Sequence, residues 1–344
     1  MAIFSNPSFD QHEKVLFVSD EASGLKAIVA VHDTTMGPAV GGCRMWPYAS
    51  DEEAITDVLR LSRGMTYKNA LAGLQFGGGK SVIIGDHRTD KSDELFRAFG
   101  RAIDALGGVY YSAEDVGITT ADIMTAHQET PYMMGLEGKS GDPSPYTALG
   151  TFLGIKAAVK YQRGVDDLTG IKVAVQGLGH VGYYLCEHLY QAGAELIVCD
   201  LNDTQLERAK RELNATVVGL DEIYSQEVDV YAPCALGATI NDITLPQLKA
   251  TIVAGCANNQ LAELRHGEQL RDRGILYAPD YVINAGGIIN VSFERDYNAD
   301  AAEAKVRKIY QTLLDIFAKA DESGQTTGVV ADEMARAIIA ANRS

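Results

Sequence analysis

The stretch that decides the fold runs from Ile171 to Asp200 and reads IKVAVQGLGHVGYYLCEHLYQAGAELIVCD. It begins with a short β-branched run, KVAVQ, that is typical of a buried strand. Three glycines, Gly177, Gly179 and Gly182, follow in the spacing G-x-G-x-x-G and open a helical pattern. A second apolar run, ELIVC, ends at Asp200. This order predicts a β-α-β unit of a parallel sheet covered by helices.

The same residues predict a dinucleotide site. Gly177 makes the tight turn, Gly179 lets the backbone approach a pyrophosphate, and Gly182 lets helix and strand pack closely. The amino end of the helix carries a partial positive charge that faces the phosphates. Asp200 follows Gly177 by 23 residues, near the spacing of about 20 expected for a carboxylate that binds the ribose. The predicted cofactor-binding residues are Gly177, Leu178, Gly179, His180, Val181, Gly182 and Asp200.

The cofactor expected at this site is NAD rather than NADP. The carboxylate of Asp200 would repel a 2′-phosphate, and no Arg or Lys occurs in DLNDTQ, residues 200–205. The alternative is a glycine-rich turn that binds nothing. That alternative leaves Asp200, at the end of the second strand, unexplained.

The bulk composition bounds the class of protein. A chain of 344 residues is too long for one ordinary core and favours about two domains. The net charge of −16 disfavours binding to nucleic acids or to anionic membranes. No apolar run approaches the roughly 18 residues of a membrane span, and the amino terminus lacks the pattern of a secretory signal. The five cysteines show no CxxC spacing, so we expect no metal site and no disulfide framework, and we favour a cytoplasmic location.

The rest of the chain alternates between strand and helix patterns. Residues 25–33 and 81–85 are predicted as strands, and residues 51–63 as an amphipathic helix with acidic residues at its start. The runs VDVYAPC, TIVAGC and GILYAPDYVINAGGIINV fit further strands, and the tail from about residue 301 is helical. Residues 133–150, MMGLEGKSGDPSPYTALG, have the composition of a linker. We therefore predict an α/β fold of two domains with a cleft between them.

The segment GLQFGGGKSVIIGD, residues 73–86, contains the Gly-Lys-Ser with which a phosphate-binding P-loop ends. A P-loop requires another glycine five residues before the last glycine, and that position is Leu74. The residues after Ser81 also indicate a strand, whereas a P-loop opens a helix. We expect Gly77–Gly79 to form a turn that lets a substrate approach the backbone beside Lys80.

Three charged residues of the first half are candidates for chemistry: Lys68, Lys80 and Asp115. Each stands near the end of a predicted element, where ligand-binding residues of α/β sheets usually lie. Two neighbouring ammonium groups lower each other's pKa, so that one could bind a carboxylate while the other acts as an acid–base group. Asp115 could then ferry protons. The alternative is that all three are solvated surface charges.

A series of motifs occurs in one unbroken order from about residue 15 to beyond residue 330. The motifs are HDTTMGPAVGGCRMWPY, SRGMTYKNALAGLQFGGGKSVIIGD, AEDVG, GDPSPYTALG, QGLGHVG, PCALGATIND, ANNQL and YAPDYVINAGG. In this combination the chain resembles the leucine, phenylalanine and valine dehydrogenases of the wider glutamate dehydrogenase superfamily. The resemblance implies a reversible, NAD-dependent oxidative deamination of an L-amino acid to a 2-oxo acid and ammonia.

The resemblance also implies roles for single residues. Lys68 is expected to bind the substrate carboxylate, Lys80 to activate water, and Asp115 to exchange protons with the substrate amino group. Gly42 and Met65 are expected to line the substrate site, because the missing side chain at Gly42 lets the substrate approach the backbone. The residues expected near the nicotinamide are Thr147, Cys234, Ala235, Leu236, Asn259 and Asn284.

The family fold implied by the resemblance has two domains. Residues 1–140 are expected to form an α/β domain for substrate binding, catalysis and oligomerisation. Residues 141–325 are expected to form a Rossmann domain that binds NAD. Residues 326–344 are expected to form a helix that packs back on the first domain. The protein is expected to be a homo-oligomer whose partners are otherwise small molecules: an amino acid, a 2-oxo acid and ammonium.

The expected substrate is a branched aliphatic amino acid: leucine, valine or isoleucine. The residues expected to line the side-chain pocket are Val40, Ala113, Ile288 and Val291. All are apolar, so none would pair with the carboxylate of a glutamate side chain. An aromatic substrate, phenylalanine, is the alternative within the family. A 2-hydroxy-acid dehydrogenase with His266 as its base is a more remote alternative, and a non-catalytic NAD-binding protein would be expected to lack Lys80 or Asp115.

Overall fold

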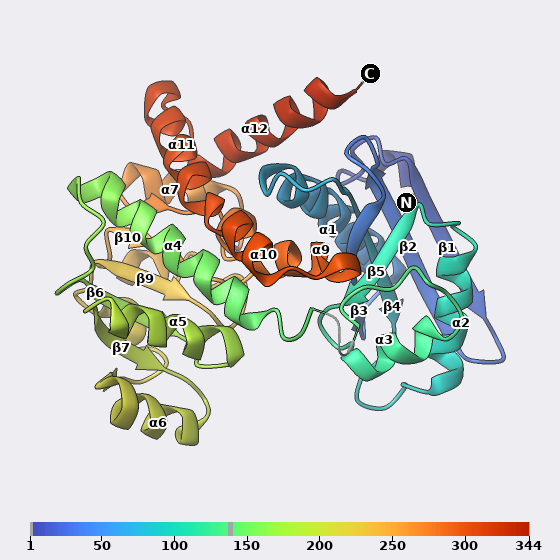
Figure 1. Ribbon diagram of the computed structural model, residues 1–344, viewed down its shortest axis with the longest axis horizontal. Coiled ribbons are helices and arrows are strands. Elements are labelled where there is room, and N and C mark those ends of the chain that lie inside the picture. The colour runs from blue at the N-terminus through green and yellow to red at the C-terminus, as the bar shows by residue number, and fades with distance from the viewer. Residues whose placement is uncertain (1–2, 137–139, 344) are drawn as a thin grey trace. The chain divides into compact units, whose positions relative to one another are not determined.

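The computed structural model describes residues 3–136 and 140–343, and it divides into two compact units (Figure 1). Unit 1 consists of Met1–Gly141, Val291–Tyr297 and Ala335–Ser344. Unit 2 consists of Asp142–Asn290 and Asn298–Met334. The predicted two-domain α/β class is confirmed. Part of the predicted linker 133–150, residues 137–139, lies outside the described residues.

The units differ from the expected domain ranges at two places. Residues 291–297 belong to unit 1, and the chain returns to unit 1 at Ala335 rather than at residue 326. Hydrogen bonds account for both differences. The carboxylate of Glu294 accepts the backbone N–H groups of Gly135 and Leu136, each at 2.8 Å. Near the carboxyl terminus, Nε of Arg336 donates to the hydroxyl of Tyr67 at 2.9 Å.

Unit 1 is built on a mixed five-stranded sheet in the order β1-β2-β4-β3-β5. Strand β3 runs parallel to β4 and β5, whereas β2 runs antiparallel to β1 and β4. The strands are β1 (Lys14–Asp20), β2 (Leu25–Asp33), β3 (Ala39–Trp46), β4 (Gly77–Ile84) and β5 (Tyr110–Glu114). The helices are α1 (Asp51–Leu71), α2 (Asp93–Asp104) and α3 (Thr120–His127), with 3-10 helices η1 (Ile3–Ser5) and η4 (Glu294–Asp296).

Helix α1 covers one face of this sheet and extends well beyond the predicted residues 51–63. It begins where Ser50 accepts a hydrogen bond from the N–H of Glu53, and its first turn is acidic, which suits the helix dipole. Its apolar face packs on alternate residues of β2 and β4 in a buried cluster. The cluster comprises Ile28, Ala30, Ala54, Val58, Leu59 and Val82. Helices α2 and α3 pack in a larger cluster with the remaining sheet residues (Figure 1).

Two buried histidines, His12 and His32, lie against α1. The rings are 4.8 Å apart between centroids, and Nδ1 of His32 is 2.8 Å from Oγ1 of Thr66. Burial, and to a smaller extent the charge of His12, lower the pKa of His32 from 6.5 to about 4. The folded state therefore prefers neutral His32, so its contribution to stability is present above pH 6.5 and is lost as the pH falls toward about 4.

We expect this histidine to make unit 1 sensitive to acid. The shift corresponds to about 3 kcal/mol of unfolding free energy across that pH window. Substituting His32→Gln removes the titrating group, so the variant should lose about 3 kcal/mol less than the wild type between about pH 7.5 and pH 4.5 in urea unfolding. Equal losses in the two proteins would show that His32 does not carry this pH dependence.

Unit 2 is built on a parallel six-stranded sheet in the order β11-β10-β9-β6-β7-β8. From β6 the chain adds β7 and β8 on one side and then β9, β10 and β11 on the other, which is the Rossmann order. The order of the strands therefore reverses between β6 and β9. The strands are β6 (Lys172–Gln176), β7 (Glu195–Cys199), β8 (Thr216–Val217), β9 (Val230–Pro233), β10 (Ile252–Val253) and β11 (Leu276–Tyr277).

Helices surround this sheet (Figure 1). Helix α5 packs on β6 and β7, and α4 packs on α5 and α11, while α7 packs on β11. The helices within unit 2 are α4 (Ser144–Arg163), α5 (His180–Gln191), α6 (Asp203–Leu213), α7 (Arg265–Asp272), α8 (Asp280–Ile283), α10 (Ala299–Val306) and α11 (Lys308–Ser323), with η2 (Ile223–Ser225) and η3 (Leu245–Gln247). Two helices cross the boundary of the units, namely α9 (Gly286–Ser292) and α12 (Thr327–Asn342).

The prediction that the whole run GILYAPDYVINAGGIINV forms strands was wrong. Only Leu276 and Tyr277 form a strand, and α8 and α9 follow. An apolar run that is buried on all sides has the same composition whether it forms a helix or a strand. The sequence pattern therefore could not distinguish the two structures. The glycines in this run are explained by a close contact between α9 and α4. A Cβ on Gly286, the first residue of α9, would lie 1.9 Å from the carbonyl oxygen of Tyr146 on α4.

Candidate active site

The three glycines before Lys80 belong to strand β4, not to the turn that we predicted. A Cβ on Gly77 would lie 2.0 Å from the carbonyl oxygen of Asp33, and a Cβ on Gly78 would lie 2.1 Å from the backbone nitrogen of Thr66. The glycines are thus needed because β2 and α1 approach β4 closely. Their effect is to seat α1 on the strand that carries Lys80.

Lys80 and Asp115, the two predicted catalytic residues, lie together in unit 1. Lys80 is on β4 with its side chain 7% exposed, and Asp115 is the first residue after β5, with its side chain 18% exposed. Nζ of Lys80 is 2.8 Å from Oδ2 of Asp115. The pair is therefore held mostly away from bulk solvent, where an ion pair is stronger than at the surface. The alternative of solvated surface charges does not apply to these two side chains.

Gly42 lies between the strands that carry this pair. Strand β3 separates β4 from β5, and Gly42 pairs with Ala113 on β5. On the other side, the pairs Val40–Gly78 and Cys43–Ser81 place Gly42 beside Lys80. A Cβ at Gly42 would lie 2.5 Å from the carbonyl oxygen of Glu114 and 2.8 Å from Cβ of Asp115. The missing side chain thus makes room for Asp115, a requirement that comes in addition to the substrate access we predicted.

An arginine for which we predicted no role also contacts this carboxylate. Nε of Arg44, on β3, donates to Oδ2 of Asp115 at 3.2 Å. Burial by itself raises the pKa of Asp115, but the charges of Lys80 and Arg44 outweigh it and hold that pKa below its usual value. The carboxylate is therefore an anion at neutral pH. A charged residue inside the strand AVGGCRMW is the sequence signal that could have pointed to Arg44.

The other predicted substrate residues of unit 1 come from α1, from β3 and from the segment Val291–Tyr297. Lys68 is half-buried in the last turn of α1. Met65 reaches β3, since its Cγ would lie 3.1 Å from a Cβ on Gly41. Val40 is completely buried, so its side chain packs inside the unit rather than facing an open surface. Val291, in the segment returned to unit 1, is 8% exposed.

In unit 2 the glycine turn has the geometry that the motif predicts. Gly177 has a φ of 103°, which favours glycine, and its N–H donates to the carbonyl of Cys199 at 2.9 Å. A Cβ on Gly182 would lie 2.0 Å from the carbonyl oxygen of Gly177, whereas a Cβ on Gly179 would meet nothing within 4 Å. Gly179 caps α5 and supplies no side-chain hydrogen bond to its N–H groups. The start of α5, which includes His180 and Val181, is thus open to a phosphate.

Asp200 lies beside this turn. Its Oδ2 accepts the N–H of Leu178 at 2.5 Å, and its Oδ1 accepts the N–H of Asn202 at 2.7 Å. Each carboxylate oxygen can accept a second hydrogen bond, so both could still bind a ribose hydroxyl. The loop after β9 packs against the glycine turn, since the Cβ of Ala235 would lie 2.8 Å from a Cβ on Gly177. These residues flank the point where the strand order reverses, at which open α/β sheets bind ligands.

Asn284 ends α8 with an amide that has an unpaired oxygen. Its Nδ2 donates to the carbonyl of Cys256 at 3.0 Å and to Oδ1 of Asn258 at 2.6 Å. Its Oδ1 is buried and has no hydrogen-bond partner among the described residues. A buried acceptor of this kind fits a donor from a ligand, such as the amide N–H of a nicotinamide. Together with the turn and Asp200, it shows that the residues present fit a dinucleotide.

The remaining predicted cofactor residues, and the predicted substrate residue Ile288, come from several elements of unit 2. Thr147, in the first turn of α4, lies against the start of α9, where its Oγ1 would be 2.8 Å from a Cβ on Gly287. Cys234 is half-buried directly after β9, and Leu236 is 76% exposed. Asn259 is exposed with a φ of 52°, and its carbonyl accepts the N–H of Ala238. Ile288, on α9, is half-buried.

His266, the base of the hydroxy-acid alternative, is placed badly for catalysis. Its side chain is 1% exposed in α7. The N–H of Glu263 donates to its Nδ1 at 3.0 Å, and its Nε2 is 3.3 Å from Oδ1 of Asp242. The ring therefore fixes the start of α7 and presents no face to a substrate.

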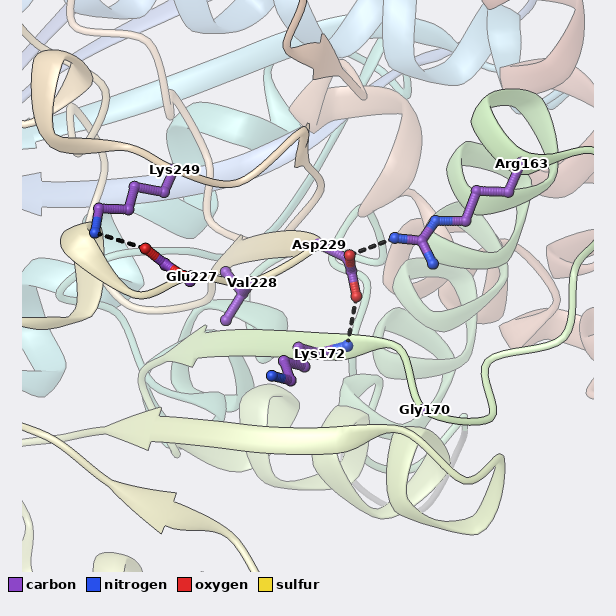
Figure 2. A pocket seen from close by; sticks show the side chains of 7 residues that line it. All are labelled: Arg163, Gly170, Lys172, Glu227, Val228, Asp229 and Lys249. Carbon is purple, nitrogen blue, oxygen red and sulfur yellow. Dashed lines mark hydrogen bonds and ion pairs between the residues drawn. The ribbon is translucent and has the colours of Figure 1, made fainter.

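A surface pocket of unit 2 lies at the opposite edge of the sheet, at the amino ends of the strands (Figure 2). Most of its charges are paired with one another. Asp229 contacts the guanidinium of Arg163 and accepts the N–H of Lys172 at 2.8 Å, and Lys249 is 3.2 Å from Glu227. Because ligands of open α/β sheets bind at the carboxyl ends of the strands, this pocket is separate from the predicted cofactor site.

Residues 3–136 and 140–343 contain neither a cluster of candidate metal ligands nor a candidate membrane span. No group of three or more His, Cys, Asp or Glu side chains in these ranges is placed to hold a metal ion. No helix in them is long and apolar enough to span a membrane.

Comparisons with known proteins identify the family. Residues 12–137 match the family described as Glu/Leu/Phe/Val dehydrogenase, dimerisation domain, and residues 199–343 match Glutamate/Leucine/Phenylalanine/Valine dehydrogenase. The chain is 54% identical to the leucine dehydrogenase of Bacillus subtilis (strain 168), over 97% of this chain and 93% of that protein. It is 50% identical to the L-tryptophan dehydrogenase of Nostoc punctiforme, over 97% and 95% of the two chains.

A solved structure agrees with these sequence matches. The crystal structure of the L-tryptophan dehydrogenase from Nostoc punctiforme superposes with a TM-score of 0.87 at 48% identity, and covers 97% of each chain. The sequence matches and the superposition both extend over nearly the whole chain. This chain therefore belongs to the Glu/Leu/Phe/Val dehydrogenase family.

Proposed function

We propose that this protein is an NAD-dependent L-amino-acid dehydrogenase. It would oxidise a branched aliphatic amino acid, with water and NAD, to the 2-oxo acid, ammonia and NADH, and it would run the reaction in reverse. The observation that carries the proposal is the buried Lys80–Asp115 pair at 2.8 Å. This pair supplies an acid–base couple in a chain whose second unit has a complete dinucleotide fingerprint. The 54% identity to a leucine dehydrogenase supports the same activity.

The residues of unit 1 would bind the amino acid and move its protons. Lys68 would pair with the substrate carboxylate, and Gly42 and Met65 would bound the space beside it. Asp115, held as an anion, would accept a proton from the substrate ammonium, which leaves the amine free to form an imine. Lys80 would then take a proton from the water that attacks the imine carbon. The domain ranges 1–140, 141–325 and 326–344 remain our proposal for how these tasks are divided.

The residues of unit 2 would hold the cofactor. The turn Gly177–Gly182 would bind the pyrophosphate and Asp200 the ribose, while the unpaired oxygen of Asn284 would accept from the carboxamide. Thr147, Asn259 and the loop Cys234–Leu236 would complete the site. NAD, when bound, supplies a hydride acceptor for the substrate Cα. We propose NAD rather than NADP because no basic residue accompanies Asp200.

The preference for NAD can be tested at Asp200. Replacing Asp200 by asparagine removes the anion that would bind the ribose, and charge-assisted hydrogen bonds are worth about 1.5–3 kcal/mol. We expect the KM for NAD to rise by about 10- to 100-fold, and the ratio of NADP to NAD activity to rise. Asp203→Asn, three residues later at the start of α6, is the matched control and should leave both unchanged. An unchanged KM for NAD in the Asp200 variant would remove this residue from the cofactor site.

The choice of substrate rests on four apolar residues, Val40, Ala113, Ile288 and Val291. None carries a charge for a glutamate side chain, and leucine, valine and isoleucine suit an apolar pocket. The aromatic alternative is favoured by a separate observation, which is the 50% identity to an L-tryptophan dehydrogenase and the superposition on its structure. One methylene in such a pocket changes selectivity by only about 1–3 kcal/mol, so the two preferences can be close.

A substrate panel decides between them. The panel measures kcat/KM for leucine, valine, isoleucine, phenylalanine and tryptophan, with NAD and then with NADP. We expect the three aliphatic substrates to exceed phenylalanine and tryptophan, and NAD to exceed NADP. A preference of about tenfold for phenylalanine or tryptophan, about 1.4 kcal/mol, would overturn the aliphatic proposal and leave the reaction type standing.

Two further proposals follow from the family. We propose that the protein is a homo-oligomer, because residues 12–137 match a domain described as a dimerisation domain. We propose a cytoplasmic location, because amino acids, 2-oxo acids and NAD are small molecules of the cell interior. Light scattering of the purified protein tests the first proposal, and a mass equal to one chain would contradict it.

A further inference from the structure

Arg44 joins two carboxylates that come from different elements. Its Nε donates to Oδ2 of Asp115 at 3.2 Å, and one of its terminal nitrogens donates to Oδ2 of Asp57 at 3.0 Å. Asp57 lies on α1, and the hydroxyl of Tyr48 donates to the same oxygen at 2.7 Å. The contacts form a continuous row from Tyr48 through Asp57, Arg44 and Asp115 to Lys80.

The row is built into the interior of unit 1. The side chain of Arg44 is 17% exposed, and it stands in a strand whose other inward residues are apolar or glycine. A buried guanidinium is costly unless its donors are satisfied, and a planar guanidinium can serve two carboxylates at once. A lysine at this position has one charged nitrogen and could not hold both partners in this geometry. The position therefore requires arginine for the contacts that it makes.

We propose that Arg44 is a positioning residue of the reaction, which holds the Asp115 carboxylate against Lys80 and is itself fixed by Asp57. This inference rests on the proposed function and deepens it. Both cations contact the same oxygen, Oδ2, so together they set where the carboxylate lies. Arg44 touches Asp115 and acts through it.

The chemistry explains why two cations are needed. Lys80 must exchange its proton during the proposed reaction, and in its neutral form it no longer stabilises the charge of Asp115. Arg44 keeps its proton throughout, since a guanidinium does not deprotonate in proteins. It therefore keeps Asp115 anionic and in place at the moment when Lys80 is neutral. Without Arg44, burial would favour the protonated carboxyl group.

The other titratable groups near Asp115 do not compete with this account. The groups that interact with it are Lys80 from β4, Arg44 and Cys43 from β3, Tyr48 from the following loop and Tyr110 from β5. Burial raises the pKa of Cys43 to about 12 and raises the pKa of both tyrosines. These three groups therefore stay neutral through the acidic and neutral range, and their charge does not change where the acidic limb of the profile is measured.

The test is the pH profile of kcat/KM for leucine oxidation in the full-length protein. Removing the Arg44 charge favours the protonated form of Asp115, so Arg44→Gln should move the acidic limb of the profile toward higher pH by about one unit or more. Its kcat at the optimum should fall by about 100-fold, because the carboxylate is no longer held in place. If Arg44 had only a structural role, Arg44→Gln would lower the yield of folded protein but would not move the acidic limb of the pH profile.

Two more variants keep the test decisive if Arg44→Gln folds poorly. Arg44→Lys restores a positive charge but not both contacts. The acidic limb of its pH profile should therefore lie close to that of the wild type, while its kcat stays low. Asp57→Asn removes an anion, so it should lower kcat without moving the limb toward higher pH. Arg97→Gln is the matched control, since Arg97 on α2 pairs at 3.1 Å with Glu129, which follows α3, and it should change neither quantity. An unshifted acidic limb in Arg44→Gln, or wild-type kcat in Arg44→Lys, would overturn the inference.

A melting experiment separates this inference from the proposed function. If Arg44 and Asp115 are coupled, Arg44→Gln should lower the Tm less in an Asp115→Asn background than in the wild type. Equal decreases would overturn the inference without any activity assay. If the wild type fails to oxidise amino acids with NAD, the proposed function is wrong, whereas the melting cycle still decides the pairing. If the wild type is active and the Arg44→Gln profile is unchanged, the inference alone is wrong.

Discussion

Replacing Lys80 by alanine is expected to lower kcat for amino-acid oxidation by about 10²- to 10⁴-fold, the usual contribution of a general acid–base group. The Nζ of Lys80 is buried against Asp115 at 2.8 Å, and in the proposed reaction it takes the proton from the attacking water. Asp115 keeps Arg44 as a partner, so the fold of unit 1 should persist. NAD binding should be nearly unchanged, because the dinucleotide fingerprint lies in unit 2.

The matched control is Lys91→Ala. Lys91 also pairs with an aspartate in unit 1, at 2.5 Å from Asp122, but it lies outside the proposed site. Its loss should leave kcat unchanged. The measurements are steady-state kinetics with leucine and fluorescence titration with NADH. A Lys80 variant that turns over at the wild-type rate would contradict the mechanism, even if the family assignment stands.

Gly42→Ala is expected to reduce kcat nearly as strongly, although it adds only one methyl group. That methyl group would lie 2.5 Å from the carbonyl oxygen of Glu114 and 2.8 Å from Cβ of Asp115, and neither atom belongs to a flexible side-chain end. The end of β5 must move, and it carries Asp115 away from Lys80. A misplacement of about 1 Å can cost about 100-fold in rate, and overpacking costs about 1–3 kcal/mol of stability.

The control for this change is Gly328→Ala in α12, where a Cβ would meet nothing within 4 Å. An alanine in a helix should be neutral or should stabilise by about 0.5–1 kcal/mol. Kinetics and thermal unfolding of both variants check the pair of predictions. If Gly42→Ala retains wild-type kcat, then Gly42 does not govern the placement of Asp115.

The Rossmann unit could be predicted from sequence because each of its signals is local. The strand, the glycine turn, the helix and Asp200 lie within residues 171–200, and the structure places them as β6, α5 and β7 in a parallel sheet. The positive φ of Gly177 and the close approach of Gly182 to Gly177 arise within this segment. Local backbone requirements of this kind leave a readable pattern in the sequence.

The parts that could not be predicted depend on residues distant in the chain. Gly77–Gly79 read as a turn because glycines usually mark turns, yet they are strand residues that β2 and α1 approach. Arg44 contacts Asp57 and Asp115, which are 13 and 71 residues away, so no spacing rule connects them. The sequence predicted roles for Lys80 and Asp115 one by one. It could not predict the direct contact between them, because that contact depends on the order of β4, β3 and β5 in the sheet.

The measurement that tests the central claim most directly is the ammonium dependence of the reductive reaction. The 2-oxo acid that corresponds to leucine is mixed with NADH and the protein, and the oxidation of NADH is followed with and without ammonium. An amine-forming enzyme needs ammonium as a substrate, so we predict no turnover in its absence and saturable turnover in its presence. Equal rates of NADH oxidation with and without ammonium would contradict the claim and would favour reduction of the oxo acid to a hydroxy acid.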